Sequence, residues 1–376
     1  MARILILCNS SGGLYDFRDR LLQELAKEHE LVISMPDDLK VSELKALPSR
    51  IINTPMDRHG MRPAKEYRLM RTYRDMMEEV KPDLVLAYTI KPVVYGGMAA
   101  RKLRIPFIPT VTGLSDGFFS SAAVRKMTAM LYKAGLKKAR CVFFQNQANL
   151  DFFSYNGIYK GKTVLVSGSG VNLERFSPLP YPEDDIIKLL YINRIKKEKG
   201  FMEFLETARH FRQLQDEGKI EIAPRFIVLG YSEDDLSKLV EKENEAGTIE
   251  YAGFSTEVEK YYAMASAVVV PSYHEGMSNV LMEASAMARP VLASAVPGCR
   301  DIVEDGKTGF TFAAKDAAAL TKAVEKFIRL SRDERKAMGE AARRKMEWEF
   351  DRNTVTAAYL EEINSVLSER KNNGSV

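Results

Sequence analysis

Residues 178–200 read PLPYPEDDIIKLLYINRIKKEKG, and this stretch decides how the chain is divided. It opens with Pro178, Pro180 and Pro182, and prolines spaced this closely are typical of a linker because proline fits neither a helix interior nor a central strand. The apolar run from Lys188 to Asn193 then has the length of a buried strand. A linker followed at once by a new strand predicts that a second domain begins here.

Short apolar runs alternate with amphipathic stretches on both sides of this linker, which is the pattern of parallel βαβ units. The strands expected in the first half are Arg3–Cys8, Glu30–Met35, Asp83–Tyr88, Pro106–Val111, Cys141–Gln145 and Thr163–Ser167. Those expected in the second half are Lys188–Asn193, Arg225–Leu229, Thr248–Tyr251, Ala267–Pro271 and Pro290–Ser294. We therefore expect an α/β protein with two Rossmann-like, doubly wound parallel-sheet domains, residues 1–170 and 171–352, and a final helix (about 353–376) that packs back on the first. Such domains would face each other across a cleft, with ligands beyond the carboxyl ends of the strands.

The bulk composition agrees with a two-domain globular protein, since 376 residues with 45% hydrophobic and 28% charged side chains exceed what one core usually serves. The apolar run from Met1 to Leu7 is too short for a signal peptide, and no segment is long enough to cross a bilayer, so we expect a cytoplasmic location. The cysteines Cys8, Cys141 and Cys299 are far apart and suit a reducing compartment better than a disulfide framework or a zinc site.

The first strand leads into Asn9-Ser10-Ser11-Gly12-Gly13. A dinucleotide-binding oxidoreductase would carry G-x-G-x-x-G here, and the spacing of Gly12 and Gly13 does not match it. A Gly-Gly turn before a helix still lets the backbone approach a ligand closely and directs amide groups toward it. A tight strand-to-helix turn without a ligand remains the alternative.

A basic turn follows the first strand of the second half. Arg194 stands at the end of that strand, and Lys199 stands before the next helix. A guanidinium fork and an ammonium beside a helix N-terminus form a metal-free clamp for a diphosphate, and this clamp can stabilise a departing nucleotide. A solvated basic loop is the alternative for this segment taken alone.

A second candidate segment runs from Val268 to Glu283. A buried strand ends at Pro271, a turn carries Glu275 and Gly276, and a helix with Glu283 follows. The amides from Gly276 to Asn279 would lie at the N-terminus of this helix, where an anion binds readily. Glu275 and Glu283 are too far apart for the acid/base pair of a glycoside hydrolase. Their spacing fits better with one carboxylate that binds a sugar and another that binds a ribose. A capping glutamate plus a surface glutamate is the alternative.

Together these residues resemble the family 4 retaining glycosyltransferases, which have the GT-B fold. The matching elements, which span nearly the whole chain in the family's order, are Gly12-Gly13, Gly168 to Phe176, Arg194 with Lys199-Gly200, and Glu275 with Glu283. A narrower set resembles enzymes of bacterial capsule, O-antigen and related glycan assembly, and it comprises Tyr88 to Pro92, Thr112 to Leu114, Glu275 to Leu281 and Pro297 to Arg300. Some of those enzymes add N-acetylhexosamine to undecaprenyl-diphosphate-linked sugars.

The resemblance implies a role for each matched residue. Arg194, Lys199 and Glu275 would be the catalytic residues, with Arg194 and Lys199 on the donor diphosphate and Glu283 on the ribose. The donor sugar and its phosphate would meet Glu275 and the amides of Gly276, Met277, Ser278 and Asn279. The Gly253-Phe254 turn would approach the base, and Gly12 and Gly13 would border donor and acceptor.

The activity implied is transfer of a sugar, a hexose or N-acetylhexosamine, from a UDP-sugar to a glycan acceptor linked to a lipid diphosphate. Retention would follow from attack on the face that the diphosphate leaves, with no side-chain base. No aspartate pair forms a D-x-D turn, so we expect no obligatory metal and no cofactor besides the nucleotide-sugar substrate. Three positions depart from the family: Ile90 stands where many members have a histidine, Ser115 replaces a usual glycine after Gly113-Leu114, and Ala288 stands where glycine often precedes Arg-Pro.

Charge is unevenly distributed, because residues 1–170 hold 26 Lys and Arg against 16 Asp and Glu, whereas the remainder holds 29 against 35. Two segments, Arg58 to Arg74 and Phe118 to Arg140, carry basic residues at helical spacing, the second mixed with apolar ones. We expect peripheral contact with anionic lipid on the inner face of the cytoplasmic membrane. The alternative is that the apolar residues of these helices pack into the core and the basic residues simply face solvent. Nucleic acid is not expected, because aromatic and basic residues do not interleave.

Two other functions share these features. A GT-B nucleotide-sugar epimerase would consume UDP-N-acetylglucosamine without an acceptor. A non-catalytic nucleotide-sugar-binding subunit would bind the donor and turn over none of it.

Overall fold

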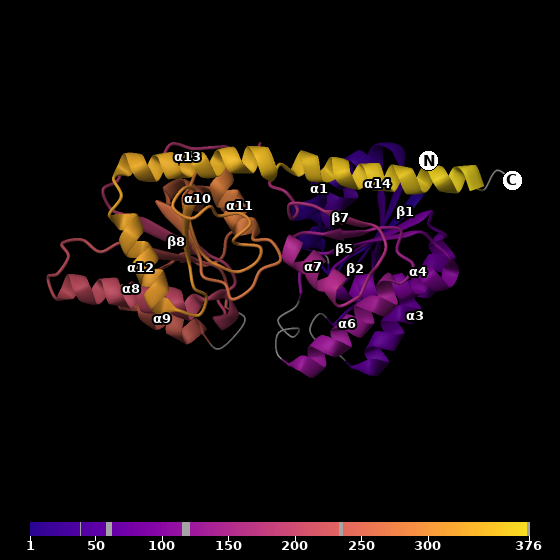
Figure 1. Cartoon of the computed structure of the whole chain (residues 1–376), viewed down its shortest axis with the longest axis horizontal. Coiled ribbons are helices and arrows are strands. Elements are labelled where there is room, and N and C mark those ends of the chain that lie inside the picture. Colours follow the sequence, from indigo (N-terminus) through magenta and orange to yellow (C-terminus); the bar gives the residue numbers. More distant parts are fainter. Residues whose placement is uncertain (38, 58–61, 115–120, 233–235, 374–376) are drawn as a thin grey trace. The chain divides into compact units, whose positions relative to one another are not determined.

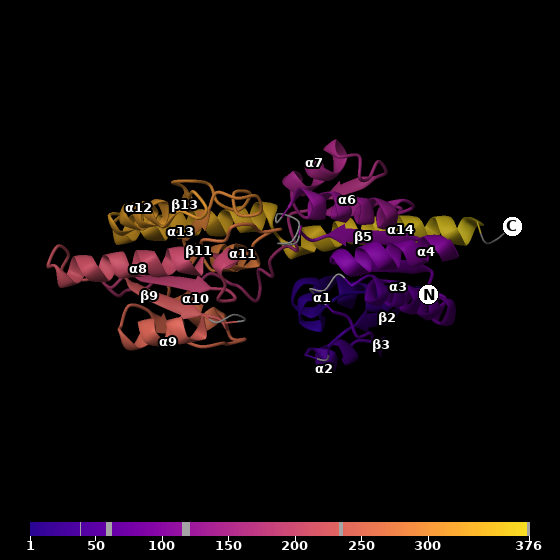
Figure 2. The same cartoon turned by 90° about the horizontal axis from the view of Figure 1, so that it is seen from below.

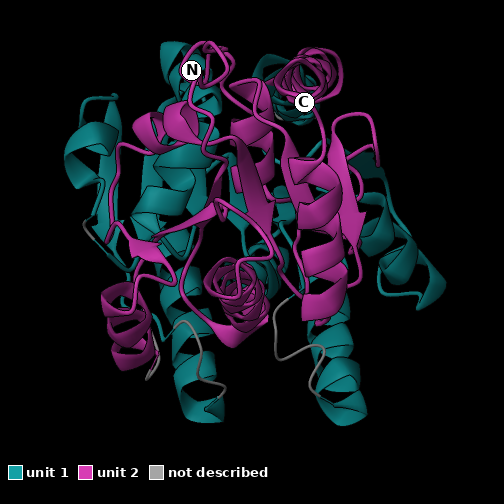
Figure 3. Cartoon of the chain, turned by 90° about the vertical axis from the view of Figure 1, so that its left-hand side faces the viewer, with its two compact units in different colours: residues 1–169, 352–376 teal, residues 170–351 magenta. Residues whose placement is uncertain are grey.

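The computed structural model describes residues 1–37, 39–57, 62–114, 121–232 and 236–373 (Figure 1). The chain forms two compact units, unit 1 with residues 1–169 and 352–376 and unit 2 with residues 170–351 (Figure 3). Each of the two boundaries lies one residue from the position expected from the sequence. None of the helices in the described residues is long and apolar enough to span a membrane.

Unit 1 is built on a seven-stranded parallel sheet in the order β3-β2-β1-β4-β5-β6-β7. Its strands are β1 (Arg3–Leu7), β2 (Glu30–Met35), β3 (Ser49–Asn53), β4 (Leu84–Tyr88), β5 (Phe107–Val111), β6 (Val142–Phe144) and β7 (Thr163–Leu165). The chain builds β1 to β3 toward one edge and then returns, so that β4 pairs with the other side of β1. The strand order therefore reverses between β1 and β4, and this is the switch point of the sheet.

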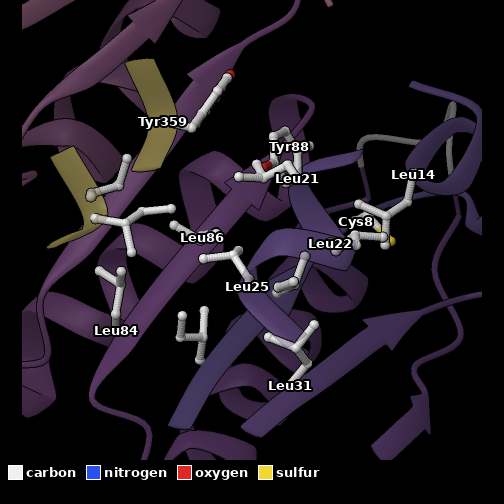
Figure 4. Close-up of a cluster of buried hydrophobic side chains, with 14 of the residues drawn as sticks. Cys8, Leu14, Leu21, Leu22, Leu25, Leu31, Leu84, Leu86, Tyr88 and Tyr359 are labelled. Carbon is white, nitrogen blue, oxygen red and sulfur yellow. The ribbon is translucent and has the colours of Figure 1, made fainter. Parts of the chain in front are cut away.

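Helices cover both faces of this sheet, as Figures 1 and 2 show. Its helices are α1 (Ser11–Glu28), α2 (Val41–Lys45), α3 (Pro63–Val80), η1 (Pro92–Gly96), α4 (Gly97–Leu103), α6 (Ala122–Leu136), α7 (Gln147–Tyr155) and α14 (Arg352–Asn373). One core lies between the sheet and α1 with α14, and Leu21, Leu25 and Tyr359 point into it (Figure 4). The other lies between the sheet and the layer of α3, α4 and α6. Because both faces are covered, the central strands are apolar on both sides.

The last helix, α14, is held against unit 1 by stacking and by hydrogen bonds. The rings of Tyr359 and Phe143 stack at a centroid distance of 3.9 Å, and the Tyr359 and Thr110 hydroxyls lie 2.8 Å apart. Arg352 at the start of the helix pairs with Asp19 of α1 at 2.6 Å. These contacts join residues more than 200 positions apart, so α14 is part of the first unit's core.

Unit 2 repeats the architecture with a six-stranded parallel sheet in the order β10-β9-β8-β11-β12-β13. Its strands are β8 (Lys188–Ile192), β9 (Arg225–Leu229), β10 (Glu250–Tyr251), β11 (Ala267–Val270), β12 (Val291–Ser294) and β13 (Gly309–Phe312). Its helices are η2 (Lys197–Lys199), α8 (Phe201–Asp216), α9 (Ser237–Glu245), α10 (Glu259–Met264), α11 (Asn279–Ala286), α12 (Ala317–Ile328) and α13 (Arg332–Glu349). The switch point lies between β8 and β11. Cores on both sides of this sheet complete a second doubly wound unit, so the predicted fold class is confirmed.

The sequence prediction missed two strands and placed one helix start too late. β3 and β13 are short edge strands of mixed polarity, which lack a continuous apolar run. Helix α1 begins at Ser11 and not after Gly13, because Ser10 serves as its N-cap and accepts a hydrogen bond from the Gly13 N–H over 3.3 Å. Gly12 and Gly13 therefore lie in the first helical turn and not in a turn before it.

Candidate functional site

Two loops of unit 2 leave neighbouring strands at the switch point. One follows β8 and contains Arg194 and Lys199, and the other follows β11 and contains Glu275. Because β8 and β11 pair in parallel, both loops start from the same edge of the sheet. Open α/β sheets bind ligands beyond this edge at the point where the strand order reverses. The residues that the sequence singled out are therefore gathered where the topology favours a ligand.

Arg194 is held by its backbone at the start of the first loop. Its N–H donates to Asn193 Oδ1 over 2.9 Å, and its carbonyl accepts from the Tyr191 hydroxyl over 2.9 Å. Burial, together with the nearby charge of Glu275, holds the pKa of Tyr191 well above its ordinary value, so this hydroxyl stays protonated and keeps donating. The backbone of Arg194 is thus held from the strand side.

Lys199 bridges the two loops. Its Nζ lies 2.7 Å from Glu275 Oε1, and the two side chains are only 17% and 14% exposed. Gly200 makes this approach possible because its φ is +70° and a Cβ there would lie 2.0 Å from the carbonyl oxygen of Pro271. Any side chain at this position would therefore push the β8 loop away from the β11 loop.

The segment from Glu275 to Asn279 leads into α11. Ser278 is the N-cap of α11, and its hydroxyl accepts the N–H of Leu281 over 3.4 Å. The turn is braced by Gly298, whose carbonyl accepts the Ser278 N–H over 3.1 Å. A Cβ on Gly298, which has φ +77°, would lie 2.5 Å from the Gly276 carbonyl oxygen. Gly276, Met277, Ser278 and Asn279 thus place the positive end of the α11 dipole at the switch point.

Glu283 lies one turn further along α11. Its Oε2 accepts a hydrogen bond of 2.8 Å from the hydroxyl of Tyr262, which is fully buried. Burial raises the pKa of Tyr262 well above its ordinary value, and the nearby Glu283 charge adds to the shift. Tyr262 therefore remains a donor and fixes the orientation of this carboxylate.

Gly253 and Phe254 follow β10. The Gly253 carbonyl accepts the Gly230 N–H over 2.8 Å, which ties this turn to the end of β9. Phe254 is 65% exposed, and its ring meets the edge of Tyr231 at a centroid distance of 5.6 Å. An exposed aromatic pair beside a ligand loop can stack against a planar ring.

Gly12 and Gly13 belong to unit 1, where they occupy the first turn of α1 at the end of β1. A Cβ at either residue would come no closer than 3.7 Å to another described atom, which is ordinary contact. Neither residue has a positive φ. Packing within unit 1 therefore does not require glycine at these positions.

Of the three departures from the family, Ser115 lies outside the described residues, and the other two have different structural settings. Ile90 follows β4 and packs on the core beneath α3 and α6, so its side chain is part of that core. The preceding Thr89 has φ +70°, which is unusual for a β-branched residue, and its buried Oγ1 has no hydrogen-bond partner among the residues that the structure describes. Ala288 has φ +57°, in the region that favours glycine, so this alanine is strained.

The sequence reasoning missed the residues that support the site. Tyr191, Tyr262 and Gly298 each hold a selected residue in place, as described above. Gly298 lies in the Pro297 to Arg300 segment that carries part of the resemblance, so the sequence did contain a signal for this residue. The two tyrosines lie in ordinary apolar runs and gave none.

Comparison with known proteins gives the family of both units. Residues 174–345 match the profile described as "Glycosyl transferases group 1". Residues 3–146 match the profile described as "Glycosyl transferase 4-like". The chain belongs to the group 1, family 4-like glycosyltransferases. Each unit of this glycosyltransferase matches one of the two profiles.

Relatives and solved structures agree with this assignment. The glycosyltransferase is 24% identical to the N,N'-diacetylbacillosaminyl-diphospho-undecaprenol alpha-1,3-N-acetylgalactosaminyltransferase of Campylobacter jejuni, over 97% of this chain and 99% of the relative. Sucrose-phosphate synthase from Thermosynechococcus elongatus superposes with a TM-score of 0.77 at 20% identity, covering 98% of this chain and 100% of that one. Anabaena HepE in complex with UDP and glucose also gives 0.77, at 17% identity over 97% and 100%. The fold is therefore GT-B.

Proposed function

We propose that this glycosyltransferase moves a hexose or N-acetylhexosamine from a UDP-sugar to a glycan acceptor carried on a lipid diphosphate, with retention at the anomeric carbon. The observation that carries the proposal is the Lys199–Glu275 contact of 2.7 Å at the switch point of unit 2, beside Arg194 and the start of α11. A cation and a helix N-terminus at one sheet edge match the charge of a diphosphate.

The division of labour follows from the chemistry of each group. Arg194 and Lys199 bind the diphosphate and stabilise its charge as it leaves. Glu275 accepts hydrogen bonds from the donor sugar, with the backbone of Gly276, Met277, Ser278 and Asn279 beside its phosphate. Glu283, oriented by Tyr262, accepts from the ribose hydroxyls. The Gly253-Phe254 turn meets the base.

In the transfer step, the bond between the sugar C1 and the diphosphate oxygen breaks, and a bond forms between C1 and an acceptor oxygen on the same face. The acceptor proton passes to an oxygen of the departing diphosphate, so no side-chain base is required. The cationic clamp takes the place of a metal in this scheme, and we propose that no metal is obligatory.

The acceptor side of the proposal draws on the relative from Campylobacter jejuni, whose name states an undecaprenol diphosphate substrate. An acceptor of that class is a membrane component. We therefore propose that the protein works as a peripheral protein on the inner face of the cytoplasmic membrane, in bacterial surface polysaccharide or glycan assembly.

The test is a panel of UDP- and GDP-sugars, each incubated with lipid-diphosphate glycan acceptors while nucleotide release and glycan mass are followed, with and without a chelator. The proposal predicts acceptor-dependent release of UDP and a heavier glycan with an α linkage. Consumption of UDP-N-acetylglucosamine without acceptor would indicate an epimerase, and binding without turnover would indicate a binding subunit. Loss of all turnover in the chelator would refute metal independence.

A further inference from the structure

A cationic groove lies in unit 1 at the edge of the sheet opposite its switch point. It has a volume of about 1020 Å³ and is lined by the last turns of α4 and α6, by the chain that leads into β6, and by residues 157–161 before β7. All these segments lead into the amino ends of strands, whereas Gly12, Gly13 and Thr89 lie at the carboxyl ends. The groove is therefore separate from the ligand edge of this unit.

The groove is strongly cationic. Its six charged lining residues are all basic: Arg101, Lys133, Lys137, Lys138, Arg140 and Lys160. Arg140 pairs with Glu369 of α14, and Arg101 donates to the Ala134 carbonyl over 2.8 Å. The four lysines are exposed, and no carboxylate of the described residues forms an ion pair with them. The sequence explains this, because residues 117–150 contain six basic residues and no acidic one.

The basic side of α3 differs in this respect. Arg71 and Arg74 form ion pairs with Asp75 of the same helix, at 3.6 and 2.7 Å, and Lys65 pairs with Asp57 at 3.5 Å. Arg58, which the sequence analysis grouped with them, lies outside the described residues. Of the two basic segments seen in the sequence, only the second presents a face whose lysines lack carboxylate partners within the described chain.

Apolar side chains lie beside these lysines. Met130 is 58% exposed and lines the groove together with an adjoining hollow of about 370 Å³, which adds Arg125 and Lys126. Tyr155, at the end of α7 and next in sequence to Asn156 of that hollow, is 94% exposed. The expected partners Phe118 and Phe119 lie outside the described residues. Exposed apolar and aromatic side chains near basic ones are characteristic of surfaces that rest on the headgroup region of a bilayer.

We infer that this groove and its apolar rim dock the protein on an anionic phospholipid surface, with lipid phosphates as counter-ions of Lys133, Lys137, Lys138 and Lys160. Charge complementarity selects this occupant, because the groove offers four lysines without carboxylate partners among the described residues and the rim offers side chains that enter a headgroup layer. A soluble phosphate would use the lysines and leave the apolar rim exposed. The inference rests on the peripheral location proposed above and names the surface responsible, which is separate from the ligand edge of unit 1.

The experiment compares two full-length variants that each lose four positive charges. The groove variant carries Lys133→Ser, Lys137→Ser, Lys138→Ser and Lys160→Ser. The control variant carries Lys65→Ser, Arg68→Ser, Arg71→Ser and Arg74→Ser on α3. Each is sedimented with phosphatidylcholine vesicles containing about 30% phosphatidylglycerol at about 0.1 M salt. Thermal unfolding shows whether each variant is folded.

The wild type should bind these vesicles and not vesicles of phosphatidylcholine alone. The groove variant should lose about 600-fold in affinity, since each of its four lost charges contributes about fivefold near an anionic surface, and the control variant should lose far less. Met130→Ser should weaken the binding that persists at high salt. Equal losses in both quadruple variants, or equal binding to neutral vesicles, would overturn the inference. So would calorimetric binding of inorganic phosphate without vesicle binding.

Nucleotide release with a water-soluble acceptor separates this inference from the proposed function. The groove variant should keep the wild-type rate in that assay, because its substitutions lie away from the ligand edge. A wild-type protein that binds vesicles but releases no nucleotide would refute the transfer proposal and leave the proposed docking surface unaffected.

Discussion

Replacing Lys199 by methionine removes one charge from the candidate site and leaves most of the side chain's length. In the structure the Lys199 Nζ lies 2.7 Å from Glu275 Oε1, with 17% and 14% of the two side chains exposed. A hydrogen bond to a charged group contributes about 1.5–3 kcal/mol. If Lys199 holds the diphosphate, Lys199→Met should weaken UDP binding by about 10- to 150-fold.

The matched control is Lys197→Met, because Lys197 lies in the same short turn and is exposed. Both variants lose one positive charge, so a general field effect would weaken UDP binding in both. Titration calorimetry with UDP measures the affinity, and thermal unfolding measures the loss of stability from breaking the Lys199–Glu275 pair. Lys197→Met should stay within about twofold of the wild type, as expected for an exposed charge.

Glu275→Gln tests the same contact from its other side, and its expected effect on UDP affinity is opposite to that of Lys199→Met. It frees the Lys199 ammonium from its partner, so UDP should bind as tightly as before or more tightly, whereas the UDP-sugar should lose affinity. The reasoning is refuted if Lys199→Met lowers the melting temperature and leaves the UDP affinity unchanged, because the pair would then serve the fold alone.

Three further predictions concern single contacts. Gly12→Ala should leave the melting temperature unchanged or raise it, because glycine is a poor helix former and its replacement adds about 0.5 kcal/mol of stability. The rate of sugar transfer should fall by about tenfold, and parallel thermal-unfolding and UDP-release assays measure the two effects. Tyr262→Phe should weaken UDP binding by about two- to tenfold in calorimetry through the lost hydrogen bond to Glu283, with a melting temperature near that of the wild type. The Arg209 guanidinium lowers the pKa of the buried Glu243 below its ordinary value of 4.5. Because this pKa is lower in the folded state, the stabilisation is present above about pH 4.5 and disappears as the pH falls through the folded pKa. Glu243→Gln should therefore cost about 1 kcal/mol at pH 7 in urea unfolding, and this cost should shrink progressively as the pH is lowered below about 4.5.

The apolar runs were sufficient to predict the central strands and the edge strands β7 and β10, but they did not predict the edge strands β3 and β13. Strands such as β2 and β9 were placed to the residue because both of their faces are covered, which gives a continuous apolar run. β3 and β13 have neighbours on one side only and carry polar or small residues, so no periodic signal marks them. Edge strands form because a paired sheet is already there, which is information that no local window contains.

The gathering of Arg194, Lys199 and Glu275 at one edge of the unit 2 sheet was predictable, because they follow strand ends and parallel strands bring their ends to one edge. What could not be predicted is which of them touch. Lys199 and Glu275 are 76 positions apart, and their contact depends on the pairing of β8 with β11 and on the close approach at Gly200. The supporting tyrosines were invisible for the same reason, since a buried tyrosine resembles a core residue until its hydroxyl is seen to have a partner.

The glycines separate the demands of the fold from those of a ligand. At Gly200 and Gly298 the backbone is left-handed and a Cβ would collide with a neighbouring carbonyl oxygen, so unit 2 itself requires glycine there. At Gly12 and Gly13 the backbone is helical, a Cβ would make only ordinary contacts, and alanine would favour the helix. Two glycines in the first turn of a helix lower its stability, and the packing of the described residues of unit 1 does not require them. A ligand that lies against the bare backbone of this turn would account for glycine at both positions.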